Sequence, residues 1–447
     1  MKAMVRLFGT SGIRGPADSL FTNQFCFDLG RTFALFLDKH RQVGKIAVGM
    51  DPRPSGPRIK QYFIAGLYHQ NREVFDEDIC PIPSMNYLLI ADSSFAGSAM
   101  ITGSHNKADL NGVKFFAFKE EILKEHEGEI TNIYEEIKEK IPAPKEAPVV
   151  AGEKKANKLY IQMLEKLAQT PFPDWKVVVD CGNGAQTEVM PKVLSKLGLQ
   201  LTTINCDLTK TFLARDTETE GAFGELQKEV IKEKACLGIG FDADGDRVVF
   251  IDGEGHFIPG DYSGALISKY GSTKLVVTPI NTSQVVEYLS KPVIRTKVGS
   301  PYVVAKMKET QADFGFEANG GGFSREVMLS RDGGSTAIKI LNLLRQTGKS
   351  LSQLVGELPR FYLYRTKVDC PWERDAEVLV AAKARFKGIK TEELDGLKIW
   401  TDNTSWILFR SSQNAPEFRV FAEAKTQEEA TKLGEDGIKL VREILSN

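Results

Sequence analysis

Apolar runs that end in polar loops recur along the chain and predict its strands. Three such runs, at residues 46–50, 177–179 and 275–277, each lead into a polar helix start, DPRPSG, DCGNGAQ and TPINTSQ. A second extended segment follows each run. Next comes a third strand that ends in a loop: AGSAMITGSHN, ACLGIGFDADGD or ADFGFEANGG. Because the order of elements repeats as well as their type, the pattern predicts three related α/β domains.

The pattern changes in the last quarter of the chain. A Pro-rich segment at 141–148 ends the first unit, and beyond residue 363 a helix, three strands and a closing helix predict a smaller α+β domain. We therefore expect four domains, at residues 1–144, 145–253, 254–365 and 366–447. Because the three special loops occupy the same place in each repeat, we expect them to converge on a central cleft.

Composition excludes several functional classes. The 447 residues are 42% apolar and 26% charged, which is typical of a soluble globular protein. The net charge of −1 argues against nucleic-acid or anionic-membrane partners. With no apolar signal segment and no long apolar run, we expect a cytoplasmic protein. The six cysteines are too widely spaced for a zinc knuckle or a redox motif, so reduced thiols are expected.

The first special loop, TGSHN at 102–106, separates two apolar strands. A hydroxyl at the end of a buried strand is a common position for a nucleophile, which makes Ser104 the candidate. His105 could orient or activate it, and Lys114 could neutralise charge on a transferring phosphoryl group. The same residue types also suit an ordinary turn.

The second loop, FDADGDR at 241–247, has three alternating carboxylates. In extended backbone Asp242, Asp244 and Asp246 would face one point, where their repulsion calls for a cation. Oxygen-only ligands suit Mg²⁺. An EF-hand calcium loop is excluded, because Arg247 stands where glycine is needed and Gly253 where the bidentate glutamate belongs. A solvated acidic turn is the alternative.

Two further loops are candidates for ligand binding. Glu317 and Asn319, set among glycines, could bridge neighbouring sugar hydroxyls, although a flexible glycine turn is the alternative. The loop from Arg410 to Glu417 could hold a phosphate, with Arg419 as a second guanidinium, although a polar hairpin turn has the same composition.

The N-terminal motif FGTSGIRG is rich in glycine but matches neither a dinucleotide-binding nor a Walker loop. Nucleotide binding is therefore not indicated. Arg14 within this motif could meet a phosphate or could be a surface arginine.

Taken together and in order, FGTSGIRG, TGSHNKADLNGVK, FDADGDR, GFEANGG and RSSQNAPEFRVFAEA resemble the motifs of the α-D-phosphohexomutases. This family includes phosphomannomutase/phosphoglucomutase and phosphoglucosamine mutase. The resemblance covers the whole chain. It implies three related α/β domains and a smaller fourth one around a central cleft.

The resemblance also implies the chemistry. Ser104 would be phosphorylated in the resting enzyme, and its phosphate would bind Mg²⁺ together with Asp242, Asp244 and Asp246. A hexose 1- or 6-phosphate would become a 1,6-bisphosphate, which also serves as activator, and would return its other phosphate to Ser104. The matched positions for phosphoryl and proton transfer are Arg14, His105, Lys114 and Arg247. Those for binding the substrate are Ser300, Glu317, Asn319, Arg410, Ser412, Gln413, Asn414 and Arg419.

Departures from the family pattern fall mainly in the ligand loops. They are Lys107 for proline, Asn319 for serine, Gly321 and Ser300 where histidine is frequent, and Gln413-Asn414-Ala415 for Gly-Thr-Glu. The serine and metal loops are intact, so these departures bear on the sugar. We expect mannose or glucose phosphates, with glucosamine phosphate as the alternative. A sugar-phosphate phosphatase and a non-catalytic sensor are the remoter alternatives.

We expect small-molecule sugar phosphates as the partners of a monomer or homodimer. Because the C-terminal domain joins the body only near residues 363–366, we also expect it to hinge while the bisphosphate turns around.

Overall fold

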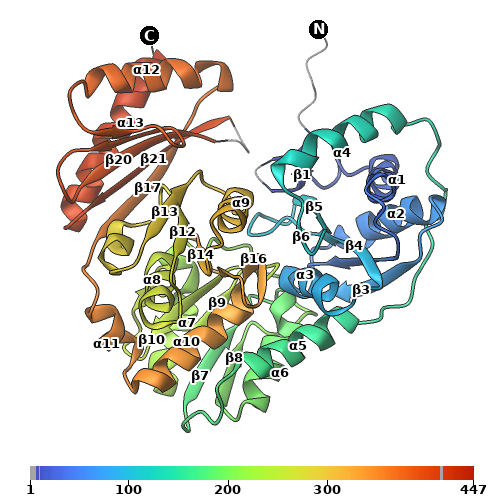
Figure 1. Cartoon of the computed structure of the whole chain (residues 1–447), viewed down its shortest axis with the longest axis horizontal. Helices are drawn as coiled ribbons and strands as arrows, with labels where there is room; N and C mark the ends of the chain where they lie inside the picture. Colours follow the sequence, from blue (N-terminus) through green and yellow to red (C-terminus); the bar gives the residue numbers. More distant parts are fainter. Residues whose placement is uncertain (1–6, 10, 413–415, 447) are drawn as a thin grey trace.

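The computed structural model describes residues 7–9, 11–412 and 416–446, which form four sheets flanked by helices (Figure 1). The predicted fold class, three α/β domains and a smaller α+β domain, is confirmed. In Figure 1 the first domain (blue) and the last (red) lie on either side of the two central ones. In the described part of the chain, no helix has the length and apolar character needed to cross a lipid bilayer.

The first sheet has the strand order β1-β5-β4-β2-β3, and β6 also pairs with β5. Strand β2 is parallel to β3 and β4, whereas β5 runs antiparallel to β4. The strands are β1 (Ile13–Pro16), β2 (Lys45–Met50), β3 (Val74–Ile79), β4 (Phe95–Ile101), β5 (Leu110–Ala117) and β6 (Glu120–Glu121). The helices are α1 (Asn23–Lys39), α2 (Gly56–His69), α3 (Ile82–Ala91) and α4 (Lys124–Ile137).

The second and third sheets repeat this plan, with orders β11-β10-β9-β7-β8 and β13-β12-β14-β15-β16. In both, the first strand is parallel to the next two and the rest return antiparallel. The second domain contains α5 (Lys155–Leu167), β7 (Lys176–Asp180), α6 (Met190–Lys196), β8 (Gln200–Ile204), α7 (Gly224–Glu233), β9 (Leu237–Phe241), β10 (Val248–Asp252) and β11 (Phe257–Ile258).

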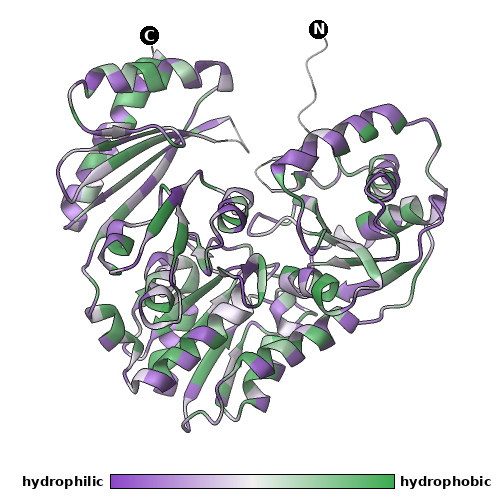
Figure 2. Ribbon diagram, in the orientation of Figure 1, coloured by the Kyte–Doolittle hydropathy of each residue, from purple (hydrophilic) through white to green (hydrophobic). Residues whose placement is uncertain are grey.

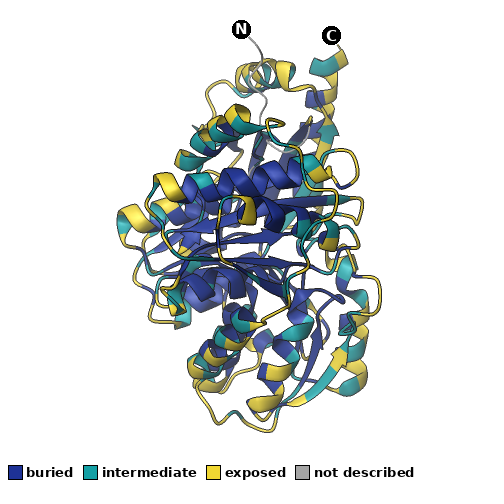
Figure 3. Cartoon of the chain, turned by 90° about the vertical axis from the view of Figure 1, so that its right-hand side faces the viewer, coloured by how far each residue is buried: buried dark blue, intermediate teal, exposed yellow. Residues whose placement is uncertain are grey.

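The third domain contains α8 (Gly260–Tyr270), β12 (Val276–Pro279), β13 (Val293–Thr296), α9 (Ser300–Thr310), β14 (Phe314–Phe316), β15 (Gly322–Ser324), β16 (Met328–Asp332), α10 (Gly333–Thr347) and α11 (Leu351–Gly356). Short 3₁₀ turns η1 (Ala185–Glu188), η2 (Glu220–Phe223), η3 (Gln284–Tyr288) and η4 (Trp372–Arg374) lie in the last three domains. Central strands such as β7 and β9 are buried on both faces, which explains their continuous apolar runs (Figures 2 and 3).

The C-terminal domain has five antiparallel strands in its sheet, not the three expected. They are β17 (Tyr362–Asp369), β18 (Thr391–Glu392), β19 (Leu397–Trp400), β20 (Trp406–Ser411) and β21 (Glu417–Ala424), packed against α12 (Asp375–Arg385) and α13 (Gln427–Ser446). Strand β17 was missed because its alternating pattern is weak: it is an edge strand, half-buried along most of its length. Residues 363–366, expected to join this domain to the body, lie within β17.

Candidate active site

Ser104 lies just beyond the end of β4, in a turn that crosses to β5. Its backbone is in the left-handed region, at φ +55°, which is uncommon for a non-glycine residue and recurs at functional sites. The serine is only 1% exposed. Its hydroxyl oxygen is buried without a hydrogen-bond partner among the described residues.

A buried arginine at the start of the first helical crossover holds this turn in place. The Arg53 guanidinium donates hydrogen bonds to the carbonyls of Ser104, Asn106 (2.7 Å), Lys107 (2.6 Å) and Leu110 (3.0 Å). It also pairs with Asp51 at 2.9 Å and stacks on the Phe212 ring of the second domain at 4.7 Å. The serine turn is therefore fixed by a charged side chain rather than by regular backbone pairing.

The three aspartates of the metal loop converge, but on a turn rather than on extended backbone. Strand β9 ends at Phe241, and Gly245 adopts φ +69°, which folds the loop back on itself. The expectation of alternating side chains on a strand was therefore wrong in its geometry. One carboxylate oxygen from each aspartate still lies within 4.8 Å of the others, so the predicted cluster is present.

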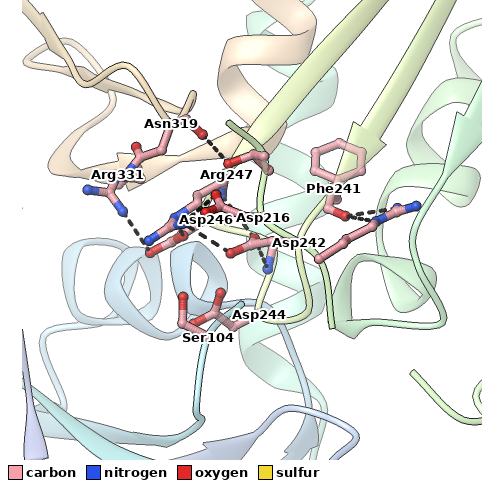
Figure 4. A network of polar contacts seen from close by, with 12 residues as sticks. Ser104, Asp216, Phe241, Asp242, Asp244, Asp246, Arg247, Asn319 and Arg331 are labelled. Atoms are coloured by element: carbon pink, nitrogen blue, oxygen red, sulfur yellow. Dashed lines mark hydrogen bonds and ion pairs between the residues drawn. The ribbon is translucent and has the colours of Figure 1, made fainter. Parts of the chain in front are cut away.

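The metal loop faces the serine turn across the boundary between the first two domains (Figure 4). The Thr102 hydroxyl accepts a hydrogen bond from the Ser104 N–H (2.8 Å) and lies 3.1 Å from a carboxylate oxygen of Asp244. The Ile82 N–H donates to the Asp244 carbonyl at 3.0 Å. These contacts join the two loops directly.

The residues fit a divalent cation. One carboxylate oxygen of each of Asp242, Asp244 and Asp246 is buried with no hydrogen-bond partner in the described chain. Leaving three carboxylates in this state is costly unless a cation takes up their charge. An oxygen-only set suits a hard ion such as Mg²⁺.

The pKa values of Asp242 and Asp246 are shifted in opposite directions. Burial, reinforced by the charges of Asp244 and Asp246, raises the pKa of Asp242 well above its usual range. Burial would also raise the pKa of Asp246, but Lys114, Arg331 and Arg247 outweigh it and lower that pKa. Burial and the neighbouring carboxylates therefore dominate at Asp242, and the nearby cations dominate at Asp246.

Basic side chains from three domains surround Asp246. The Lys114 ammonium lies 3.3 Å from one of its oxygens, Arg331 of β16 approaches the same oxygen to 3.8 Å, and Arg247 approaches the other to 3.9 Å. Arg14, on β1, pairs in register with Gly112, two residues before Lys114. Its buried Nε has no hydrogen-bond partner among the residues described.

His105 is neutral in this setting. The charge of Arg247, then burial and Arg14, lower the pKa of His105 to about 2. Its buried Nδ1 has no hydrogen-bond partner in the part of the chain that the structure describes. A neutral imidazole beside the serine can accept a hydrogen bond at one ring nitrogen.

The sugar loop reaches the same place from the third domain. Glu317 accepts hydrogen bonds from the Gly299 N–H (3.1 Å) and from Arg331. The Asn319 carbonyl accepts from the Thr217 hydroxyl at 2.6 Å, and its side-chain oxygen is buried without a partner among the described residues. Ser300 is buried at the first position of α9.

The phosphate loop stands on the C-terminal domain. Arg410, at the end of β20, is buried and pairs with Asp395 at 2.7 Å, while Asp395 also accepts from the Val298 N–H of the third domain at 2.9 Å. Ser412 is buried, and Arg419 is paired with Glu417 at 2.9 Å. Gln413 and Asn414 lie outside the described residues.

Several contributors carry no signal in the sequence. Arg53 follows a predicted strand and Thr102 is the first residue of the serine loop, but only the folded chain shows that they support Ser104. Arg331 and Asp395 lie in ordinary strand and turn segments, and no spacing links them to Glu317 or Arg410. The position of Arg53 directly after a predicted strand, in DPRPSG, is the one hint available.

Three family models describe most of the chain: phosphoglucomutase/phosphomannomutase alpha/beta/alpha domains I, II and III match residues 5–141, 158–255 and 259–362. A phosphoglucomutase/phosphomannomutase of Thermococcus kodakarensis is 34% identical, over 99% of this chain and all of that one. The phosphoglucosamine mutase of Bacillus subtilis is 32% identical over 95% and 96%.

A solved phosphoglucomutase/phosphomannomutase family protein from Burkholderia thailandensis has the same fold, with a TM-score of 0.82 at 20% identity, covering 99% of this chain and 98% of that one. These matches extend over nearly the whole chain, and they add to the two central observations in the structure, a buried serine hydroxyl and a cluster of three aspartates. The chain belongs to the α-D-phosphohexomutase family, the phosphoglucomutases and phosphomannomutases, and is a phosphohexomutase enzyme.

Proposed function

We propose that this enzyme interconverts hexose 1-phosphates and hexose 6-phosphates through a phosphorylated Ser104 and a hexose 1,6-bisphosphate. The observation that carries the proposal is the Ser104 hydroxyl, which is buried, has no partner in the described chain, and lies on a turn that contacts Asp244 of the aspartate cluster through Thr102. A hydroxyl held in this way is suited to carry a phosphoryl group.

Mg²⁺ is the cation that we propose for the aspartate cluster. Asp242, Asp244 and Asp246 would hold it together with an oxygen of phosphorylated Ser104, leaving room for a further phosphate oxygen. When bound, the ion neutralises charge on the phosphoryl group and helps to align it. The orphaned carboxylate oxygens support this assignment.

The cations around Ser104 bind and orient the phosphoryl group. Lys114 and Arg247 lie close to Asp246, where they would face the non-bridging oxygens of the phosphoryl group. Arg14 would approach the same group from β1. Phosphoryl transfer needs positioning and charge neutralisation more than covalent chemistry by the protein. His105 is the candidate for moving the proton between the sugar hydroxyl and Ser104.

Two loops bind the rest of the substrate. Glu317, with Asn319 and Ser300 nearby, would accept sugar hydroxyls, and Arg410 with Ser412 would hold the phosphate that is not reacting. Gln413, Asn414 and Arg419 complete the proposed phosphate loop. Because one loop binds sugar hydroxyls and the other binds a phosphate, the site would accept the bisphosphate in either orientation. Each phosphate could then reach Ser104 in turn.

Mannose and glucose phosphates are the substrates that we favour, with glucosamine phosphate as the alternative. Relatives with both names match nearly the whole chain. The departures at Asn319 and Gly321 lie in the loop that would contact the sugar. Parallel kcat/KM measurements on mannose, glucose and glucosamine 1-phosphates would decide between these sugars.

Intact-mass spectrometry tests the reaction. We expect a mass increment of one phosphate that maps to Ser104, and turnover that depends on Mg²⁺ and on glucose 1,6-bisphosphate as activator. Release of inorganic phosphate without bisphosphate dependence would indicate a phosphatase. A chain that binds sugar phosphates but never carries phosphate on Ser104 would indicate a sensor.

A further inference from the structure

A close approach between the sugar loop and the metal loop leaves position 321 no room for a side chain. Gly321 adopts φ +78°, and a Cβ atom there would lie 2.2 Å from the Asp246 carbonyl oxygen and 2.8 Å from Cγ of Arg331. The Arg331 side chain fills the neighbouring space.

Arg331 is joined to both loops. One terminal nitrogen donates to Glu317. The other lies 3.8 Å from an Asp246 oxygen, as Figure 4 shows, and Lys114 approaches the same oxygen to 3.3 Å. The residue is 8% exposed, and its Nε is buried with no acceptor in the part of the chain described. Burial lowers its pKa, but a guanidinium stays charged at neutral pH.

We infer that Arg331 is a further catalytic residue, whose guanidinium binds non-bridging oxygens of the phosphoryl group while it moves between Ser104 and the sugar. This inference rests on the proposed function. An arginine held only to neutralise Glu317 would be expected to have its remaining donors satisfied as well. Here Nε has no partner among the described atoms, and one terminal nitrogen has only a distant one, a carboxylate oxygen of Asp246 in the metal loop.

The position of Arg331 also links the chemistry to substrate recognition. Glu317 accepts from the Gly299 N–H, and the preceding Val298 N–H donates to Asp395, which pairs with Arg410. A line of short contacts therefore runs from the phosphate loop through the sugar loop to the metal loop. Arg331 is its connection to the reacting phosphoryl group.

In the step itself, the bond from phosphorus to Ser104 Oγ breaks and a bond to the sugar oxygen forms. The proton of the sugar hydroxyl ends on Ser104 Oγ. Arg331 stays protonated throughout and only stabilises charge on the non-bridging oxygens. A lysine could supply the charge but not the two-pronged geometry, so Arg331→Lys should recover part of the rate.

The test is single-turnover transfer from phosphorylated enzyme, prepared with glucose 1,6-bisphosphate, to glucose 1-phosphate. We expect Arg331→Met to slow this transfer by roughly 100-fold at saturating sugar, a typical loss for one transition-state donor. Arg331→Lys should fall between the two. The matched control is Arg345→Met, because Arg345 is an exposed arginine of the same domain that donates only to the Pro171 carbonyl in the described structure.

A double variant separates catalysis from support of Glu317. If Arg331 only positions Glu317, Arg331→Met should raise KM alone, and Arg331→Met/Glu317→Gln should be no slower than Glu317→Gln; either result would overturn the inference. Should Arg331→Met fail to fold, the same comparison with Arg331→Lys decides. A wild-type enzyme that neither carries nor transfers phosphate would contradict the proposed function itself, and this inference with it.

Discussion

The second and third domains are joined in a different way from the third and fourth. Between the second and third, one hydrophobic cluster runs through both sheets, including Ile239 and Phe250 on one side and Phe314 and Phe316 on the other. Between the third and fourth, the apolar contact is small: Ile280 packs against Trp406, Leu408 and Phe421.

The rest of the joint between the third and fourth domains is polar. Glu423 accepts from the Gln284 N–H (2.9 Å) and from the Trp406 indole (2.8 Å), and the Lys398 ammonium donates to the Ile280 carbonyl (3.1 Å). Shared cores resist relative movement, whereas small polar interfaces permit it. The metal and sugar loops therefore stand on one rigid body, and the phosphate loop on a unit with its own core.

The largest expected effect is the loss of turnover when Ser104, which faces the metal loop of the rigid body, is replaced. Ser104→Ala should reduce turnover by roughly 10³-fold or more, because the phosphoryl carrier is lost. The fold should survive, since the deleted hydroxyl has no hydrogen-bond partner in the described structure. Steady-state assays and a thermal melt would check both points, with exposed Ser94→Ala as the control. Near-normal activity would rule out Ser104 as the carrier.

A second effect on the same body concerns the metal. Asp244→Asn should weaken Mg²⁺ binding and phosphoryl transfer together. The loss should be at least roughly 10–100-fold, which is the cost of removing a residue that only hydrogen-bonds to a metal ligand. The isosteric change keeps the shape of the loop. Titration of activity against Mg²⁺ measures the shift. Unchanged activity without any divalent cation would show that the aspartates merely form a turn.

The separable side is tested by Arg410→Ala. If the C-terminal domain closes when Arg410 holds a phosphate, the variant should raise KM, lower kcat and release more bisphosphate per turnover, at a cost of about 2–5 kcal/mol. Arg385→Ala, an exposed arginine on α12, serves as the control. Weaker binding without extra bisphosphate release would mean that the domain contributes affinity but does not hinge.

The smallest expected effect is a dependence of stability on pH, which arises from Lys398 at the polar interface between the third and fourth domains. Burial, and then the charge of Arg295, lowers the pKa of Lys398 to about 7, while Glu423, Glu392 and Glu287 oppose the shift. The unfolded chain therefore binds more protons at this position between pH 7 and pH 10, so stability rises with pH over that window.

Between pH 9 and pH 7 the melting temperature should accordingly fall, by no more than about 5 °C. Lys398→Met should reduce this pH dependence, whereas Lys432→Met on the exposed face of α13 should leave it unchanged. Melts at the two pH values compare them. Identical pH dependence in all three proteins would mean that Lys398 does not titrate in this range.

The sequence allowed the repeated domains and the order of the loops to be predicted, because period and turn chemistry are local properties. It also allowed the aspartate cluster to be predicted, although the backbone reason was wrong: Gly245 turns the loop where alternation suggested a strand. The burial of Ser104 and the roles of Arg53 and Arg331 could not be found in this way. They depend on contacts between residues that only strand pairing and domain packing bring together.

The pairing of β1 with β5 has a consequence for the order in which the first domain folds during synthesis. In the second and third domains the outermost strand, β11 or β16, follows its neighbour directly in the chain. In the first domain that place is taken by β1, where Ile13 pairs with Val113. On the ribosome β1 must wait for β5 before it can pair, and such long-range closures are slow. Arg14 is synthesised before any other residue of the proposed site, but it reaches its place only after β5 has been made.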